Sequence, residues 1–228
     1  PLSIDRRNIP GQTDQIDSLG LTIEKSHRVK ELGGGAVREQ VVQAEPVEIF
    51  GPSGAAFLIK RKALYDVATP SFEILRSKRE NGDKKLEFFD EDFFIYKEDV
   101  DLAYRMRSRG WKTFLIASAR AYHHRTARQK KISVVKNRKT KSKFVNYHSY
   151  KNHWFFLIKN VSLEMFLRFG VYIIFYEAQK FLYLLFCEIS TLTSLRGVAL
   201  MVPRMFKKRQ YILRSRRVSI SELARWMK

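Results

Sequence analysis

The chain has little cysteine and no long uninterrupted run of apolar residues. Cys187 is the only cysteine among 228 residues, which rules out an internal disulfide framework and suits a reducing compartment. Residues 154–187 are dense in aromatic and aliphatic side chains, but charged residues interrupt them at Lys159, Glu164, Arg168, Glu177 and Lys180. No run therefore approaches the ~20 apolar residues that span a bilayer.

Acidic residues are missing from a long part of the chain. None occurs in residues 102–163, whereas basic residues crowd residues 125–143 and 204–217, and the formal net charge is +20. Such charge attracts polyanions, which include a nucleotide diphosphate, anionic lipid headgroups and nucleic acid. A solvated loop carries the same charge without any ligand, and we expect residues 125–149 to form a basic, mobile loop.

A pair of carboxylates, Glu98 and Asp99, stands at the start of a helical pattern. Leu102 and Met106 lie one turn apart on one face, and Gly110 is a typical C-terminal stop. The free N–H groups and the dipole at a helix start stabilise acidic side chains, so capping alone explains the pair. A carboxylate that is held ionised and exposed is also what a general base requires. Composition does not choose between these interpretations.

Two adjacent histidines, His123 and His124, follow the β-prone residues 111–117. In an extended chain neighbouring side chains point to opposite faces, so at most one of them faces a given site. A neutral imidazole is a common metal ligand, but one histidine does not hold a metal by itself. No second cluster with metal-ligand spacing is visible in the sequence, so the other ligands must come from elsewhere.

A glycine-containing loop, with Ser53 between Gly51 and Gly54, precedes the apolar residues 55–59. We expect residues 55–59 to form a buried strand. Glycine suits a loop whose backbone approaches a ligand closely or adopts positive φ. An ordinary turn before a strand has the same composition, so both interpretations stay open.

Several blocks of this sequence resemble one enzyme family. They are GPSGAAFLIKRKAL at residues 51–64, FFDEDFFIYKEDVDLAYRMRSRGW at 88–111 and ARAYHHR at 119–125. In order and spacing they resemble the carboxyl-terminal half of family 2 glycosyltransferases with the GT-A fold, especially a bacterial rhamnosyltransferase-like branch that builds cell-surface polysaccharides. YKNHWFFLIKN at 150–160 resembles the segment after the catalytic domain in that branch.

The resemblance implies roles for individual residues. Asp99 matches the catalytic base, which deprotonates the acceptor hydroxyl as that oxygen attacks the anomeric carbon and inverts it. Glu98 matches the neighbour that shapes the acceptor site, and residues 51–55 match a turn that lies against donor and acceptor. His123 matches the histidine that helps hold a divalent metal, Mg or Mn, on the donor diphosphate, with His124 as a second candidate.

The implied reaction transfers a sugar from a nucleotide-diphosphate donor to a lipid-linked or polysaccharide acceptor. Rhamnose as the sugar follows only from the likeness to the branch. The candidate substrate-binding residues are Gly51, Ser53, Gly54, Asp101 and Arg125.

One part of the family pattern is missing upstream of Gly51. In the family, the nucleotide-binding half comes first and carries an Asp-rich diphosphate motif. Asp14 and Asp17, in QTDQIDSLG, have different surroundings. We therefore expect this chain to be the carboxyl-terminal part of a longer enzyme, or a truncated copy. It would need the missing half, or a partner subunit that carries it, to bind the donor.

These observations predict an α/β fold in four parts. Residues 1–45 are expected to be irregular, 46–124 the catalytic α/β half with a helix near 60–67, 125–149 the basic loop and 150–228 a helical tail.

The tail is expected to lie on the cytoplasmic face of the cell membrane as two amphipathic helices. Its aromatic residues would enter the headgroup region, and four basic residues would meet anionic lipid: Arg204, Lys207, Lys208 and Arg209. Packing of these helices on the catalytic half or on a second subunit is the alternative. A non-catalytic basic protein that binds membrane or nucleic acid is the alternative function, although nucleic acid is disfavoured because charge is its only support.

Overall fold

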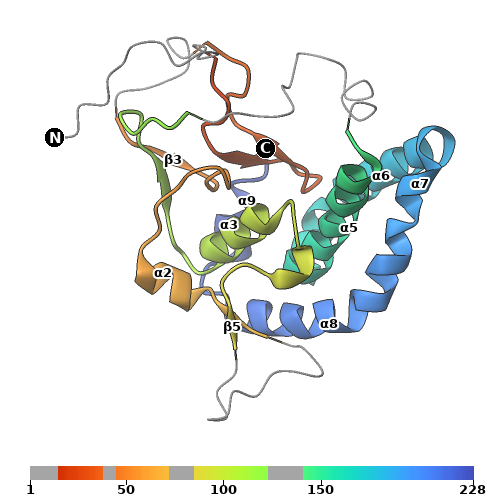
Figure 1. The fold of residues 1–228 in the computed structure, drawn as a ribbon. Helices are drawn as coiled ribbons and strands as arrows, with labels where there is room; N and C mark the ends of the chain where they lie inside the picture. The colour runs from red at the N-terminus through yellow and green to blue at the C-terminus, as the bar shows by residue number, and fades with distance from the viewer. Residues whose placement is uncertain (1–14, 38–44, 72–84, 123–140) are drawn as a thin grey trace.

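Short antiparallel strands and longer helices make up the computed structural model, which describes residues 15–37, 45–71, 85–122 and 141–228 (Figure 1). The strands pair two by two: β1 (Leu21–Ile23) with β2 (Val29–Glu31), β3 (Val47–Ile49) with β6 (Thr113–Leu115), and β4 (Thr69–Pro70) with β5 (Leu86–Glu87). The helical elements are α2 (Arg61–Asp66), η1 (Glu91–Phe93), α3 (Glu98–Ser108), α5 (Lys143–Asn160), α6 (Leu163–Cys187), α7 (Ile189–Leu192), α8 (Ser194–Arg214) and α9 (Ile220–Ala224). The predicted mixed α/β class is confirmed.

Helix α3 lies at the centre of the described part, between the β3–β6 pair and α5 (Figure 1). Leu102 and Met106 face α2, whereas Ala103 and Tyr104 face the larger core that includes Phe156 of α5. A helix that is buried on opposite faces cannot show the single apolar stripe of a surface helix. The helix ends where predicted, because Gly110 adopts a left-handed φ of 84° just after it.

Gly51 allows β3 to approach α3 closely. A Cβ atom at this position would lie 2.3 Å from the Cβ of Ala103. Its carbonyl oxygen also accepts a hydrogen bond from the N–H of Leu21, which joins the first hairpin to the same place. The absence of a side chain at Gly51 therefore serves packing between elements.

An ionic cluster joins α3, α5 and α8 to the segment around η1. Lys208 of α8 lies 2.8 Å from Glu87 and 2.5 Å from Asp90, and its side chain is fully buried. Lys159 of α5 pairs with Asp90 and lies 2.8 Å from Asp101. With the flanking pairs, the ionic cluster contains Glu87, Asp90, Asp92, Asp101, Arg105, Lys159, Arg204 and Lys208. Four acids and four bases leave it formally neutral.

Three basic residues of α8 turn toward the protein, whereas Arg196, Lys207 and Arg214 are exposed. Pro203 lies inside α8, and the helix changes direction along its length in Figure 1. Arg204 and Lys208 then belong to the ionic cluster, and Arg209 donates a 2.7 Å hydrogen bond to the carbonyl oxygen of Ile158. The expectation that all four residues meet anionic lipid is wrong for the fully buried Lys208, whereas Arg204 and Arg209 are half-buried and Lys207 is exposed.

Other local expectations also change. The prediction of a buried strand at residues 55–59 is wrong, because they form no strand and the side chain of Leu58 is fully exposed. Residues 15–37, expected to be irregular, contain the β1–β2 hairpin. Helix α5 begins within the expected basic loop, whose residues 125–140 lie outside the described residues.

The C-terminus returns to the first hairpin. The N–H of Lys228 donates to the carbonyl oxygen of Ile23 at 3.1 Å, and the carbonyl oxygen of Lys228 accepts from Lys25 at 3.0 Å. Figure 1 shows this end beside the hairpin. The helical tail is thus an integral part of the described structure.

Substitution of Lys208 by Met is expected to lower the free energy of unfolding by ~3–5 kcal/mol, because it leaves buried carboxylates without their counter-charge. Lys207→Met, at the exposed neighbouring position on the same helix, is the matched control and is expected to leave the urea midpoint unchanged. Equal urea midpoints for the two variants would contradict a structural role for the ionic cluster.

Stability is also expected to fall in acid. Burial alone would raise the pKa of Asp90, but the ammonium groups of Lys159 and Lys208 outweigh it and hold the pKa well below its usual range. The unfolded chain, with an Asp pKa of ~3.9, then binds protons first. The unfolding free energy should be fully present above about pH 5 and decline as the pH falls below about 4. Urea titrations across this pH range measure the decline in unfolding free energy. About 0.5 M NaCl should leave the decline in place, because salt screens exposed pairs more than buried ones.

Candidate active site

Asp99 lies at the N-terminal end of α3, where it contacts the glycine-containing loop. Its Oδ2 accepts a 2.9 Å hydrogen bond from the backbone N–H of Gly54, and its Oδ1 accepts a 2.8 Å bond from the N–H of Val100. Asp99 is half-buried and Gly54 is exposed, so the carboxylate remains open to solvent. The structure brings together two predicted site residues that are 45 positions apart.

The neighbouring acid has a different environment. The Oε2 atom of Glu98 is buried and has no hydrogen-bond partner in the described part of the chain. Burial raises the pKa of Glu98, and the negative charge of Asp99 raises it further. Glu98 therefore keeps its proton to a higher pH than a fully solvated glutamate does.

The backbone just before the pair is strained. Phe94, Tyr96 and Lys97 all have positive φ, between 61° and 69°, although none is glycine. Phe94, with ψ of −56°, is the centre of a γ-turn in which the N–H of Ile95 donates to the carbonyl oxygen of Phe93 at 2.7 Å. Each such residue costs ~1–3 kcal/mol and persists only where its surroundings enforce it.

Asn152 of α5 supplies that enforcement. Its side chain is fully buried, and its Nδ2 atom donates to the carbonyl oxygens of Phe93, Ile95 and Tyr96 at 2.7–2.8 Å. An amide has only two N–H groups, so three acceptors must share them. The segment that carries Glu98 and Asp99 into α3 is therefore fixed by one side chain from another helix.

A cation accompanies Asp99. Burial lowers the pKa of Lys97 to about 8, although the negative charges of Asp99 and Glu177 oppose the shift. A lysine with this pKa carries its charge at neutral pH and can lose it in mild base. Lys97 and Asn152 were not identified from the sequence. Asn152 is one of three buried asparagines on α5, with Asn146 and Asn160, so the sequence pattern alone does not single it out.

The other predicted site residues are not all gathered here. Ser53 lies half-buried beside Gly54 in the same loop, whereas Gly51 packs on α3. Asp101 is fully buried in the ionic cluster, so its assignment to substrate binding is corrected to a structural role. His123, His124 and Arg125 lie outside the described residues.

The described residues do not supply a metal site. No group of three His, Cys, Asp or Glu side chains within residues 15–37, 45–71, 85–122 and 141–228 is arranged to hold an ion. The predicted Mg or Mn therefore stays a prediction that depends on ligands elsewhere.

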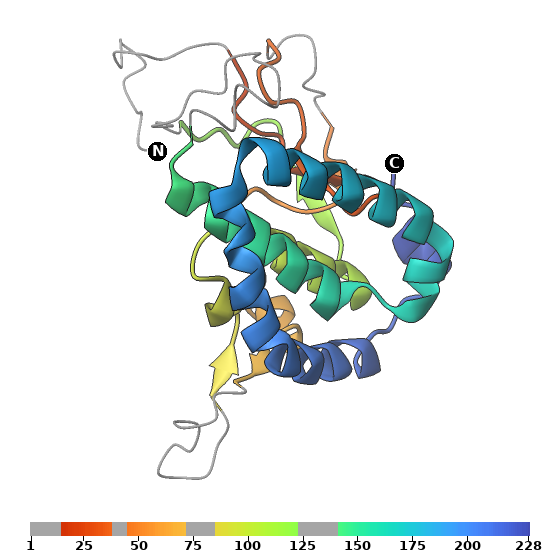
Figure 2. The ribbon, with the colours of Figure 1, turned by 90° about the vertical axis from the view of Figure 1, so that its right-hand side faces the viewer.

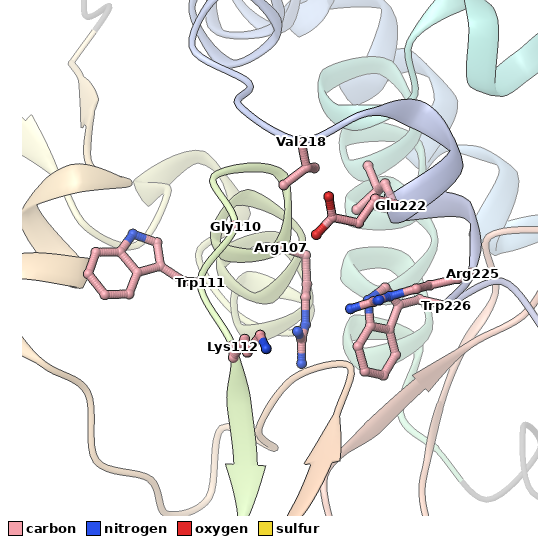
Figure 3. Close-up of a pocket in the computed structure, with 9 residues that line it drawn as sticks. Arg107, Gly110, Trp111, Lys112, Val218, Glu222, Arg225 and Trp226 are labelled. Atoms are coloured by element: carbon pink, nitrogen blue, oxygen red, sulfur yellow. The ribbon is translucent and has the colours of Figure 1, made fainter.

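A small hollow lies at the opposite end of α3 from Asp99 (Figure 3). Its lining includes Arg107, Lys112, Arg225 and Trp226. The guanidinium of Arg107 lies 4.0 Å from the ring centre of Trp226 and donates to the carbonyl oxygen of Phe50 at 2.8 Å. These contacts occupy Arg107, so its guanidinium is not free to bind a ligand in this hollow.

No family model, curated protein or solved structure matches this chain.

Replacing Asn152 by Ala is expected to release the segment at 93–97. Its amide hydrogen exchange should rise at least several-fold, with a loss of about 1–3 kcal/mol in unfolding free energy for buried carbonyl groups left unpaired. Asn152→Asp should have a larger effect, because a carboxylate would face three carbonyl oxygens. Ser149→Ala, about one turn earlier on α5, is the control. Unchanged amide hydrogen exchange at residues 93–97 in both Asn152 variants would show that this segment keeps its conformation without the Asn152 amide.

Proposed function

We propose that this chain is the acceptor-side part of an inverting glycosyltransferase with a GT-A fold. The observation that carries the proposal is the hydrogen bond between Asp99 and the N–H of Gly54. It joins two of the sequence blocks that resemble the family, at a carboxylate that solvent can reach. The strained backbone before Glu98 supports it, since such strain is concentrated at functional sites.

Asp99 acts as the general base in this proposal. It accepts the proton of the acceptor hydroxyl while that oxygen bonds to the anomeric carbon. The bond from the anomeric carbon to the diphosphate oxygen breaks with its electron pair, and the carbon inverts. The two backbone hydrogen bonds fix the orientation of the carboxylate, and each oxygen keeps a further lone pair for the incoming hydroxyl.

Two neighbouring residues complete the site. Glu98, whose Oε2 atom is buried, shapes the acceptor side, and Lys97 supplies a positive charge beside the carboxylate pair. Donor and metal binding are assigned to a nucleotide-binding half. The donor is a nucleoside diphosphate sugar, for which rhamnose is one candidate, and the acceptor is a lipid-linked or polysaccharide hydroxyl.

The test compares Asp99→Asn with Glu91→Gln in this chain joined to the nucleotide-binding half that the proposal requires. Nucleoside diphosphate release from thymidine diphosphate rhamnose and other nucleotide sugars is measured with saccharide acceptors. Asp99→Asn should reduce transfer ~10²–10⁴-fold, the usual contribution of a general base. Glu91 is exposed and pairs with Lys85, so its amide should retain full activity.

Transfer by Asp99→Asn within a few-fold of the parent would remove Asp99 as the base. In that case the carboxylate only caps α3 and holds the loop. Loss of transfer in both variants would point to a general effect of charge near η1 and would equally count against the proposed role.

A further inference from the structure

The outer face of α6 exposes a continuous apolar stripe. Leu167, Val171 and Phe175, spaced four residues apart, are 76%, 80% and 65% exposed. Further exposed apolar residues on this helix are Leu163, Phe166, Ile174, Phe181, Leu182, Leu185 and Phe186. A monomer in water rarely leaves so large a contiguous apolar surface uncovered.

The opposite face of α6 is occupied by protein. Met165, Phe169 and Ile173 are buried, and the carboxylate of Glu177 forms a 2.7 Å hydrogen bond with the imidazole of His153 on α5. By length and composition α6 is the one helix among the described residues that could cross a membrane, with 28% of its apolar window buried. Because protein covers one side, lipid can cover only the other, so the helix is suited to lying along a bilayer surface.

Cations and tyrosines line one flank of this stripe. The ammonium of Lys25 lies 5.5 Å from the ring centre of Tyr172, and the guanidinium of Arg28 lies 5.8 Å from that of Tyr176. Lys180 lies 5.5 Å from the same Tyr176 ring. Tyrosine is enriched at the headgroup level of bilayers, and each nearby Lys or Arg adds attraction to anionic lipid.

The cations come from two separate parts of the sequence. Lys25 and Arg28 belong to the β1–β2 hairpin, which packs against α6 through His27 and Phe169 with ring centres 6.3 Å apart. In Figure 2, α6 crosses the upper part of the face that is turned toward the viewer, with α5 below it and the hairpin behind it. The fold thus places an apolar stripe and a cationic flank on one surface.

We propose that this surface docks on an anionic bilayer. Leu167, Val171 and Phe175 enter the boundary between headgroups and acyl chains, while Lys25 and Arg28 meet lipid phosphates. The partner is the lipid surface itself, because a flank of cations and tyrosines beside an apolar stripe is the pattern of interfacial helices. Docking does not depend on sugar transfer and goes beyond the proposed enzymatic function.

The test is flotation of the full chain with phosphatidylcholine vesicles that contain about one third phosphatidylglycerol. Val171→Gln combined with Phe175→Gln should lower vesicle partitioning about ten-fold or more. Both side chains are exposed, so circular dichroism and Tm should match the parent. The matched control is Leu58→Gln with Ile116→Gln, which removes two exposed apolar side chains away from α6 and should bind like the parent.

A second pair of variants tests the flank. Lys25→Gln with Arg28→Gln should weaken binding to the anionic vesicles and leave residual binding to pure phosphatidylcholine unchanged.

Three results would overturn the proposal: a parent that stays unbound, an α6 variant that floats like the parent, or a flank variant with unaltered lipid dependence. Sedimentation of the same proteins provides a further check. A dimer abolished by the α6 changes, without vesicle binding, would assign the stripe to a second copy of the chain. None of these outcomes depends on transfer activity.

Discussion

The pairing of Lys208 with Glu87 and Asp90 is the interaction on which the described structure depends most. It brings α8 against the segment that leads into η1 and, through Lys159, against α3 and α5. Removing charges from water is unfavourable, so such a cluster is stable only when its members compensate one another. Here four acids meet four bases. Helix α8 therefore packs with two of its six basic residues, Arg204 and Lys208, directed into the cluster.

The same contacts support the candidate active site. Helix α5 supplies Lys159 to the ionic cluster and Asn152 to the strained turn before Glu98. Asp99 then emerges from a backbone that is fixed on both sides, by α3 and by the amide of Asn152. A base on such a support is oriented before a substrate arrives, which is how positioning contributes to catalysis. A solvated helix cap needs no strained turn behind it.

Local features of the sequence predicted local structure well. Leu102, Met106 and Gly110 marked the helix and its end, and the carboxylate pair marked its start. The contacts that define the site could not be predicted in the same way. Asn152 binds carbonyl oxygens 56 to 59 residues away, and Lys208 meets Glu87 across 121 residues. Residues 55–59 look like a strand, but a strand also needs a hydrogen-bonded partner, and no described strand pairs with this segment.

The ionic cluster also shows where the excess positive charge of the chain lies. Since its eight members sum to zero, the whole excess of +20 belongs to residues outside it. Part of that excess, Lys25 and Arg28, lies beside the apolar stripe of α6. The positively charged residues of the chain therefore fall into two groups, which lie in different places and have different roles. Cations inside the protein stabilise the fold around α3, and cations on the hairpin are available to an anionic surface. A protein that bound polyanions by charge alone would gain nothing from burying Lys208.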